Sequence, residues 1–244
     1  MKNSSSIDNS IKEIINTKSY NFNEEFNEKD KFEKIAAEYN FIPDGLEQKL
    51  CMLKKYIELG IPVLIEGPTG SSKTLSSEIV CKYLEREIIS INLSSDTTIG
   101  DLMGKLIGNT NTKSKISFSD GPSKEAFIKG KCLRLDEINL ASESILQCIE
   151  QSLDSKILSI ELNGCLFKEY KMHENFCLIA TQNPKEGLYS NKRKEHSYRL
   201  LSRFQIIRFD EIDDIILEKI AFGLEKRFSG KNNNNININS LIKI

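Results

Sequence analysis

The stretch EGPTGSSKT, residues Glu66–Thr74, determines how the rest of the chain is interpreted. It matches the phosphate-binding pattern G-x-x-x-x-G-K-[ST] at Gly67, Lys73 and Thr74, but Ser72 stands where that pattern has its second glycine. If Ser72 has ordinary helical backbone angles, its small side chain costs little and still lets the backbone approach a phosphate. The motif favours a phosphate site, and a Gly/Ser-rich turn without a ligand is the alternative.

The composition indicates a globular chain with no strong overall charge. The 244 residues include 34 Lys+Arg and 35 Asp+Glu, so no chain-wide basic field for nucleic acid exists, although a local basic patch stays open. We find no direct nucleic-acid signature, no membrane-spanning stretch and no secretory signal. Six cysteines without a C-x-x-C pair indicate reduced core thiols, and two histidines make a metal site built on them improbable. We expect an intracellular protein, cytoplasmic or nuclear.

Short apolar stretches rich in β-branched residues alternate with helix-like segments. This alternation predicts an α/β fold, a three-layer sandwich with a five-stranded parallel sheet covered on both faces. The expected helices cover 46–57 and 75–86, and the expected strands cover 61–65, 88–93, 131–136, 176–181 and 205–209.

Two segments interrupt the alternation and predict hairpin inserts. Residues 114–130 contain Gly121-Pro122 between two runs, which suggests a hairpin-like insert. Residues 156–175 contain Asn-Gly flanked by apolar alternation, which is a strong short hairpin signal.

The loop has a clear chemical role if it binds a nucleotide. Backbone N–H groups of residues 70–74 would cradle the β-phosphate at the start of the following helix. Lys73 would place its charge on the β- and γ-phosphates, and the Thr74 hydroxyl would bind Mg²⁺. The predicted nucleotide-binding residues of this loop are Gly67, Pro68, Thr69, Gly70, Ser71, Ser72, Lys73 and Thr74.

The stretch CLRLDEIN, residues 132–139, places two carboxylates at the end of a strand. Ligands bind at this edge of parallel sheets, where Asp136 would join the Mg²⁺ shell, and Glu137 would accept a proton from the attacking water or orient it. A solvated helix N-terminus is the alternative, which the nearby phosphate motif makes less favoured.

The stretch LIATQNP, residues 178–184, ends a strand in polar side chains. The Asn183 amide could bind the γ-phosphate or the attacking water. A turn asparagine before Pro184 is the alternative, and the residues alone favour it.

Arg203 lies just before the last expected strand. At a subunit boundary it could reach a neighbour's γ-phosphate as an arginine finger. A plain surface arginine is the alternative, and Arg199 or Arg208 could take the role instead.

In this order the motifs resemble those of the AAA+ ATPases, in particular the dynein-related branch that includes midasin and the MoxR proteins. The resemblance covers about 43–225 and implies a P-loop NTPase fold, with the sensor strand between the Walker A and Walker B strands and hairpins that face the pore of a ring. The matching stretches are PVLIEGPTGSSKT, INLSSDTTIGDLMG, GPSKEAFIKGKCLRLDEINLASESILQCIEQSLD, FCLIATQNP and LLSRF.

The resemblance also implies residue roles. MoxR-like members often have alanine where Ser72 stands, so a small residue there does not by itself mean a dead site. The implied roles are phosphate and Mg²⁺ binding for Lys73 and Thr74, metal binding for Asp136, catalytic glutamate for Glu137, sensor for Asn183 and arginine finger for Arg203.

The domain organisation departs from that family at its end. We expect a polar, disordered tail over 1–40 and a nucleotide-binding core over 41–209. AAA+ modules continue into a helical lid, of which only a first helix over 210–229 is predicted, so we expect a truncated lid. The Asn-rich segment 230–244 is predicted to be disordered.

The resulting hypothesis is Mg²⁺-dependent ATP binding and hydrolysis, with ATP and Mg²⁺ as cofactors. The module would self-associate or join an AAA+ ring and remodel a protein or ribonucleoprotein client. The alternative is a nucleotide-binding, non-hydrolysing scaffold or a truncated AAA+ fragment. A small-molecule kinase is a third possibility, for which we find no acceptor-binding block.

Overall fold

The computed structural model describes residues 26–27, 29–39, 41, 45–108, 116–162, 166–184 and 198–211. The chain divides into two compact units: the described residues up to Met52 belong to one, and Leu53–Glu211 form the other. Helix α4 (Glu47–Glu58) crosses this boundary. The expected lid helix and Asn-rich tail lie outside the described residues.

The first unit contains helix α3 (Lys29–Glu38), so the prediction of a disordered N-terminal tail was wrong for this segment. The reason is a short apolar face at helical spacing, formed by Phe32, Ile35 and Ala36, all of them buried. The rings of Phe26 and Phe32 pack with centroids 4.4 Å apart.

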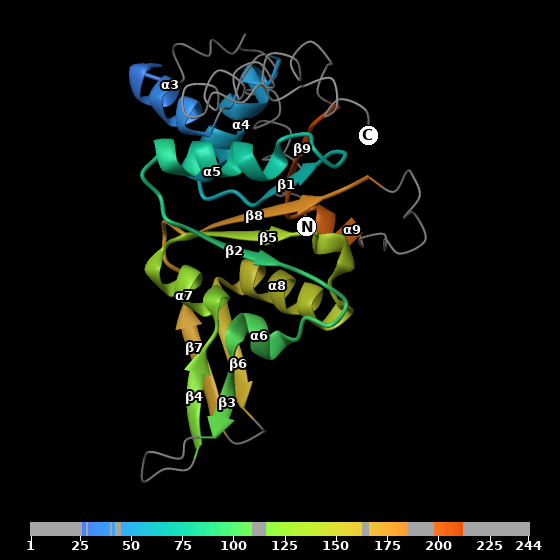
Figure 1. The fold of residues 1–244 in the computed structure, drawn as a ribbon. Helices are drawn as coiled ribbons and strands as arrows, with labels where there is room; N and C mark the ends of the chain where they lie inside the picture. Colours follow the sequence, from blue (N-terminus) through green and yellow to red (C-terminus); the bar gives the residue numbers. More distant parts are fainter. Residues whose placement is uncertain are drawn as a thin grey trace, which may run out of the picture. The chain divides into compact units, whose positions relative to one another are not determined.

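The second unit is built on a five-stranded parallel sheet, as predicted, in the order β2-β5-β8-β1-β9 (Figure 1). The expected position of the sensor strand is also confirmed, because β8 lies between β1 and β5. The strand bounds are β1 Val63–Glu66, β2 Ile88–Asn92, β5 Cys132–Asp136, β8 Cys177–Gln182 and β9 Gln205–Arg208.

Helices cover both faces of this sheet, which confirms the three-layer prediction (Figure 1). One face packs against α5, and the other packs against α6, α7 and α8. Along the chain, η1 directly follows β5, and α9 precedes β9. The bounds are α5 Lys73–Tyr83, α6 Ile99–Met103, α7 Pro122–Lys129, η1 Ile138–Leu140, α8 Glu143–Ser155 and α9 Tyr198–Leu201.

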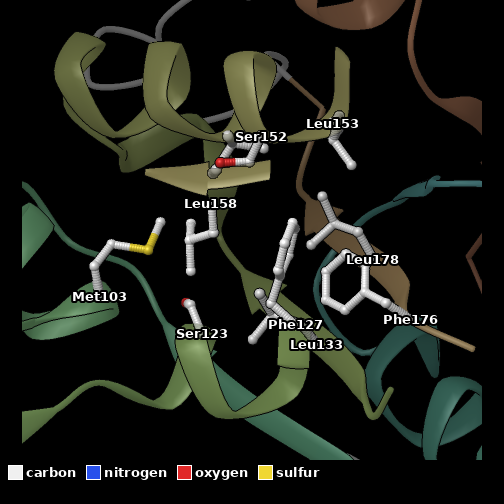
Figure 2. A pocket seen from close by; sticks show the side chains of 10 residues that line it. Met103, Ser123, Phe127, Leu133, Ser152, Leu153, Leu158, Phe176 and Leu178 are labelled. Atoms are coloured by element: carbon white, nitrogen blue, oxygen red, sulfur yellow. The ribbon is translucent and has the colours of Figure 1, made fainter. Parts of the chain in front are cut away.

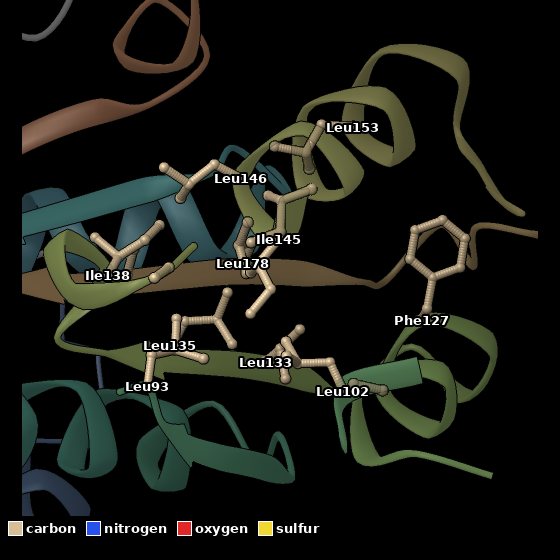
Figure 3. Packing of buried hydrophobic residues seen from close by; sticks show 14 of the residues in the cluster. Leu93, Leu102, Phe127, Leu133, Leu135, Ile138, Ile145, Leu146, Leu153 and Leu178 are labelled. Carbon is tan, nitrogen blue, oxygen red and sulfur yellow. The ribbon is translucent and has the colours of Figure 1, made fainter. Parts of the chain in front are cut away.

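Strand β5 shows why the two faces differ. Side chains alternate along a strand, so Leu133 and Leu135 join the apolar core against α8 (Figure 3). Arg134 and Asp136 lie on the opposite face, where Arg134 contacts α5. On β5, one face therefore supplies apolar core, and the other supplies polar side chains toward the end of the strand.

The core contains a small cavity between the sheet, α7 and α8 (Figure 2). Its volume is about 30 Å³, which is room for a water molecule or two. Nearly all its lining is apolar, and among the described residues the buried Ser123 hydroxyl has no hydrogen-bond partner. A cavity of this size and character does not resemble a nucleotide site.

The first hairpin pairs β3 (Gly104–Gly108) with β4 (Ile116–Asp120). Its predicted location within 114–130 was therefore wrong, because β4 pairs with a strand that precedes the insert. The Gly121-Pro122 step starts α7 instead of making the turn. Proline suits this position because the first helical N–H has no partner inside the helix.

The second hairpin is confirmed: β6 (Ile157–Leu162) pairs antiparallel with β7 (Leu166–Lys171). The Asn-Gly turn that predicted it lies outside the described residues. The two hairpins contact each other through a cation–π interaction, with Lys168 Nζ of β7 5.9 Å from the ring centroid of Phe118 on β4. Helix α7 also contacts the second hairpin, because Lys124 Nζ lies 4.4 Å from the Tyr170 ring centroid.

None of the helices in the described part of the chain has the length and apolarity needed to cross a bilayer. The described cysteines are free thiols, as expected.

We predict that Gly104→Ala destabilises the root of the first hairpin. Gly104 has φ +119°, and a Cβ there would lie 2.5 Å from the Ser119 carbonyl oxygen and 2.5 Å from the Phe118 ring. Backbone strain and overlap should lower the free energy of unfolding by about 1–3 kcal/mol. Chemical denaturation measures this value. Gly100→Ala is the matched control, since its nearest neighbour would be 3.5 Å away, and equal effects from both changes would contradict the prediction.

Candidate active site

The carboxyl ends of β1, β5 and β8 bring the predicted motifs together at one edge of the sheet. At their centre is the ammonium group of Lys73, a residue that is only 8% exposed. Its Nζ donates to the carbonyl oxygens of Gly67 and Pro68, each at 2.7 Å, and to Asn183 Oδ1 at 2.8 Å. The loop therefore wraps around the lysine that we expect to bind phosphate.

Asn183 joins two motifs that are far apart in the sequence. Its Oδ1 accepts from Lys73, and its Nδ2 donates to Glu137 Oε1 at 2.8 Å. These two bonds fix which way the amide points, because the ammonium group can only donate and the carboxylate can only accept. An asparagine that serves a turn alone would not link the lysine to the carboxylate.

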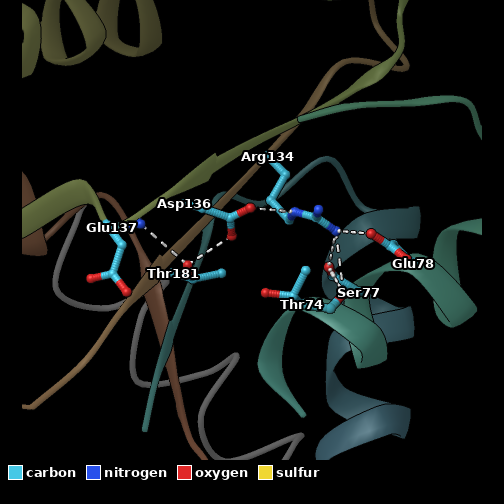
Figure 4. Close-up of polar contacts among 7 residues, drawn as sticks. All are labelled: Thr74, Ser77, Glu78, Arg134, Asp136, Glu137 and Thr181. Atoms are coloured by element: carbon cyan, nitrogen blue, oxygen red, sulfur yellow. Dashed lines mark hydrogen bonds and ion pairs between the residues drawn. The ribbon is translucent and has the colours of Figure 1, made fainter. Parts of the chain in front are cut away.

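Both oxygens of Asp136 are held by protein donors (Figure 4). Thr181 Oγ1 donates to Oδ1 at 2.8 Å, and Arg134 Nε donates to Oδ2 at 3.0 Å. Thr181 Oγ1 also accepts from the backbone N–H of Glu137 at 3.4 Å. The orientation of this carboxylate is therefore set by its neighbours.

The sequence pattern alone indicated no role for Arg134 or Thr181. Two signals were available: Arg134 lies two residues before Asp136 and so on the same face of β5, and Thr181 is the next residue on β8 after Ala180, which pairs with Leu135. Arg134 is 4% exposed and lies between the carboxylates of Asp136 and Glu78. This pairing on two sides makes the buried charge tolerable.

Ser72 does not have ordinary helical backbone angles, so the condition under which its side chain would cost little is not met. Its φ is 62° and its ψ 20°, the left-handed conformation that favours glycine, and Gly70 also has positive φ at 83°. The loop needs this conformation to turn into α5. As N-cap, Ser72 makes no side-chain capping bond, so the first N–H groups of α5 are not capped by it and can receive an anion.

Two other loop positions meet strong local constraints. A Cβ at Gly67 would lie 2.5 Å from the carbonyl oxygen of Phe209, so the loop begins in direct backbone contact with the residue that follows β9. Glu137 has φ 57°, a strained value for a residue with a side chain, at the sharp turn from β5 into η1.

The oxygen atoms present suit Mg²⁺. Thr74 is exposed, and Figure 4 shows its hydroxyl pointing toward the side on which Asp136 and Glu137 lie. Magnesium in nucleotide sites usually takes one or two protein oxygens and completes its shell with water and phosphate. Among the described residues no group of three or more His, Cys, Asp or Glu side chains could hold a metal ion.

Arg203 lies elsewhere, against α8. Its Nε donates to Asp154 Oδ1 at 2.8 Å, a second guanidinium nitrogen pairs with Oδ2, and a third nitrogen donates to the Arg199 carbonyl. Hydrogen bonds from this guanidinium hold the pKa of Asp154 below its usual range. Among the described interactions none joins Arg203 to the Lys73 cluster.

The competing arginines are also paired. Arg199 lies 3.4 Å from Glu150, and Arg208 donates to Glu66 at 3.3 Å. Both are far more exposed than Arg203, whose side chain is 18% exposed.

We predict that Ser72→Gly stabilises the protein. The left-handed conformation costs a residue with a Cβ roughly 1–2 kcal/mol, while glycine adds about 0.5–1 kcal/mol of unfolded-state entropy. The free energy of unfolding should rise by up to about 1 kcal/mol in thermal or chemical denaturation. Ser72→Ala keeps the Cβ and should not stabilise, so equal stabilisation by both changes would refute a backbone origin.

Comparison with known proteins places these motifs in one family. The sequence model for the AAA domain (dynein-related subfamily) matches residues 62–204. Midasin of Dictyostelium discoideum is 34% identical over 164 residues, which are 65% of this chain and 3% of midasin. Midasin of Giardia intestinalis is 26% identical over 242 residues, 90% of this chain and 5% of that protein.

A relative much shorter than the midasins also matches the chain. The uncharacterized protein YojN of Bacillus subtilis is 36% identical over 166 residues, 67% of this chain and 52% of YojN. The chain thus spans about half of this relative and a few per cent of the two midasins.

The fold agrees with these matches. A solved structure described as "a putative ATPase from Cytophaga hutchinsonii" superposes with a TM-score of 0.58 at 21% identity, over 84% of this chain and 57% of the other. On the family match over residues 62–204, the chain belongs to the dynein-related subfamily of AAA domains.

Proposed function

We propose that the chain binds ATP with Mg²⁺ and hydrolyses it at the cluster formed by Lys73, Thr74, Asp136, Glu137 and Asn183. One observation carries the proposal: Asn183 is hydrogen-bonded to Lys73 on one side and to Glu137 on the other. The group that would bind the terminal phosphates and the group that would activate water are thereby held at a fixed separation.

Two features of the loop support phosphate binding: the positive charge of Lys73 and the backbone N–H groups at the start of α5. A phosphate oxygen is a stronger partner for the Lys73 ammonium than the neutral carbonyls of Gly67 and Pro68 that it contacts now. The first N–H groups of α5 add further donors. Bound Mg²⁺ would supply charge neutralisation at the phosphates, with Thr74 and Asp136 as the protein groups that hold it.

Glu137 is suited to act on water. Its Oε1 accepts a hydrogen bond from the Asn183 amide. This bond orients the carboxylate, so that Oε2 points away from Asn183. A carboxylate so placed can accept the proton of a water that attacks the γ-phosphate. Asn183 would then both position this base and contact the phosphate through the same amide.

We further propose that the domain works beside other AAA modules and acts on a protein or ribonucleoprotein client. The midasins that it resembles are far longer than this chain, which supports action within a larger array. Arg203 would serve the active site of a neighbouring subunit, after exchanging Asp154 for a phosphate.

We predict that Glu137→Gln abolishes hydrolysis and retains binding. The amide cannot take up a proton, so the kcat of phosphate release should fall by about 100-fold or more. ATP affinity, measured by titration calorimetry, should change by little, whereas Lys73→Ala should lose affinity. ATP binding by the wild-type protein without turnover at any protein concentration would support a scaffold instead and overturn the hydrolysis proposal.

We predict that mixing two inactive variants restores turnover if Arg203 acts on a neighbour. Arg203→Ala keeps Glu137, and Glu137→Gln keeps Arg203, so a mixed interface contains one complete site. Phosphate release should peak at intermediate mixing ratios and increase with total protein concentration. If every mixture shows only the summed residual activities of the two variants, Arg203 does not act in trans. Arg208→Ala mixed in the same way is the control for a merely exposed arginine.

A further inference from the structure

We propose that Arg134 is a positioning residue that sets the spacing between Thr74 and Asp136, and through it the Mg²⁺-dependent part of nucleotide binding. This inference rests on the proposed function. Arg134 lies in the middle of the buried strand β5, outside the phosphate-binding loop.

The guanidinium of Arg134 reaches both halves of the expected metal site (Figure 4). Its Nε donates to Asp136 Oδ2 at 3.0 Å, and one terminal nitrogen donates to the backbone carbonyl of Thr74 at 3.2 Å. The same terminal nitrogen contacts Ser77 Oγ at 3.2 Å and Glu78 Oε1 at 2.9 Å on α5. One side chain therefore ties strand β5 to the first two turns of α5.

The geometry of this contact is rigid. A guanidinium group is planar, with its donors in a fixed fork, so its partners are held in fixed directions. The side chain of Arg134 is only 5% exposed, so water does not compete for these bonds. Lysine, a single point charge on a flexible stem, could pair with Asp136 or with Glu78 but would not span both.

Charge neutralisation alone does not explain the arrangement. Glu78 by itself would compensate the arginine, since the two lie 2.9 Å apart. The second carboxylate is that of Asp136, whose other oxygen is already bonded by Thr181. Arg134 and Thr181 together leave the Asp136 carboxylate a single orientation.

The expected effect is selective because the phosphate-binding contacts lie elsewhere. The hydrogen bonds of Lys73 to Gly67, Pro68 and Asn183 do not involve Arg134. Loss of Arg134 should free the Asp136 carboxylate on one side and remove the link to the Thr74 backbone, which carries the hydroxyl offered to Mg²⁺, and it should leave the lysine cluster in place.

The test compares ATP affinity with Mg²⁺ and with EDTA, by titration calorimetry, for the wild-type chain and Arg134→Met. Loss of a residue that orients a metal ligand typically costs about 10–100-fold in metal affinity. The gain in ATP affinity due to Mg²⁺ should therefore fall by about tenfold or more. The affinity in EDTA should stay close to that of the wild type.

Three variants separate positioning from folding. Glu78→Gln removes the distal carboxylate but keeps Asp136 bonded, so it should preserve the Mg²⁺ gain even if the melting temperature falls. Arg134→Lys should give an intermediate Mg²⁺ gain, and it remains informative if Arg134→Met does not fold. In an Asp136→Asn background, Arg134→Met should cause no further loss of the Mg²⁺ gain.

The outcomes are distinguishable. An unchanged Mg²⁺ gain in Arg134→Met, or equal losses of affinity with Mg²⁺ and with EDTA, would overturn the positioning role and leave the proposed function standing. Wild-type protein that binds no ATP under either condition would overturn the proposed function and this inference with it.

Discussion

The hydrogen-bonded chain from Lys73 through Asn183 to Glu137 is the interaction on which the rest of the site depends. It joins residues 110 and 46 positions apart and exists only because β8 lies between β1 and β5. Parallel strands end at the same edge, so each strand brings one polar group to that edge without any long loop. The sheet order is thus the structural basis of the site, and the surrounding helices keep it in place.

Most of the fold could be predicted from the sequence because it depends on local patterns. The five apolar strands and the Asn-Gly hairpin were recognised from residues within a few positions of one another. The β3–β4 hairpin was misplaced because its partner strand lies outside the insert, and a Gly-Pro step serves a turn or a helix start equally well. The face of α3 was missed because three apolar residues in a polar segment do not show by themselves that they will be buried.

The site was partly predictable for the same reason. Lys73, Asp136 and Glu137 belong to contiguous motifs, whereas Asn183 was ambiguous until the sheet order placed it between them. The roles of Arg134 and Thr181 require knowing which side chains of neighbouring strands and of α5 meet, which no single segment reveals. The positive φ of Ser72 was likewise hidden, because the tightness of a turn depends on the loop around it and not on the size of one side chain.

The contact between Gly67 and Phe209 has a mechanical consequence. Backbone approaches backbone so closely there that even a methyl group on Gly67 would overlap the Phe209 carbonyl. The Phe209 N–H also donates to the Glu66 carbonyl at 2.7 Å, which clamps the two segments together. The loop and Phe209 are therefore held as one piece, and a displacement of the backbone at Gly67 would have to be shared by the backbone at Phe209.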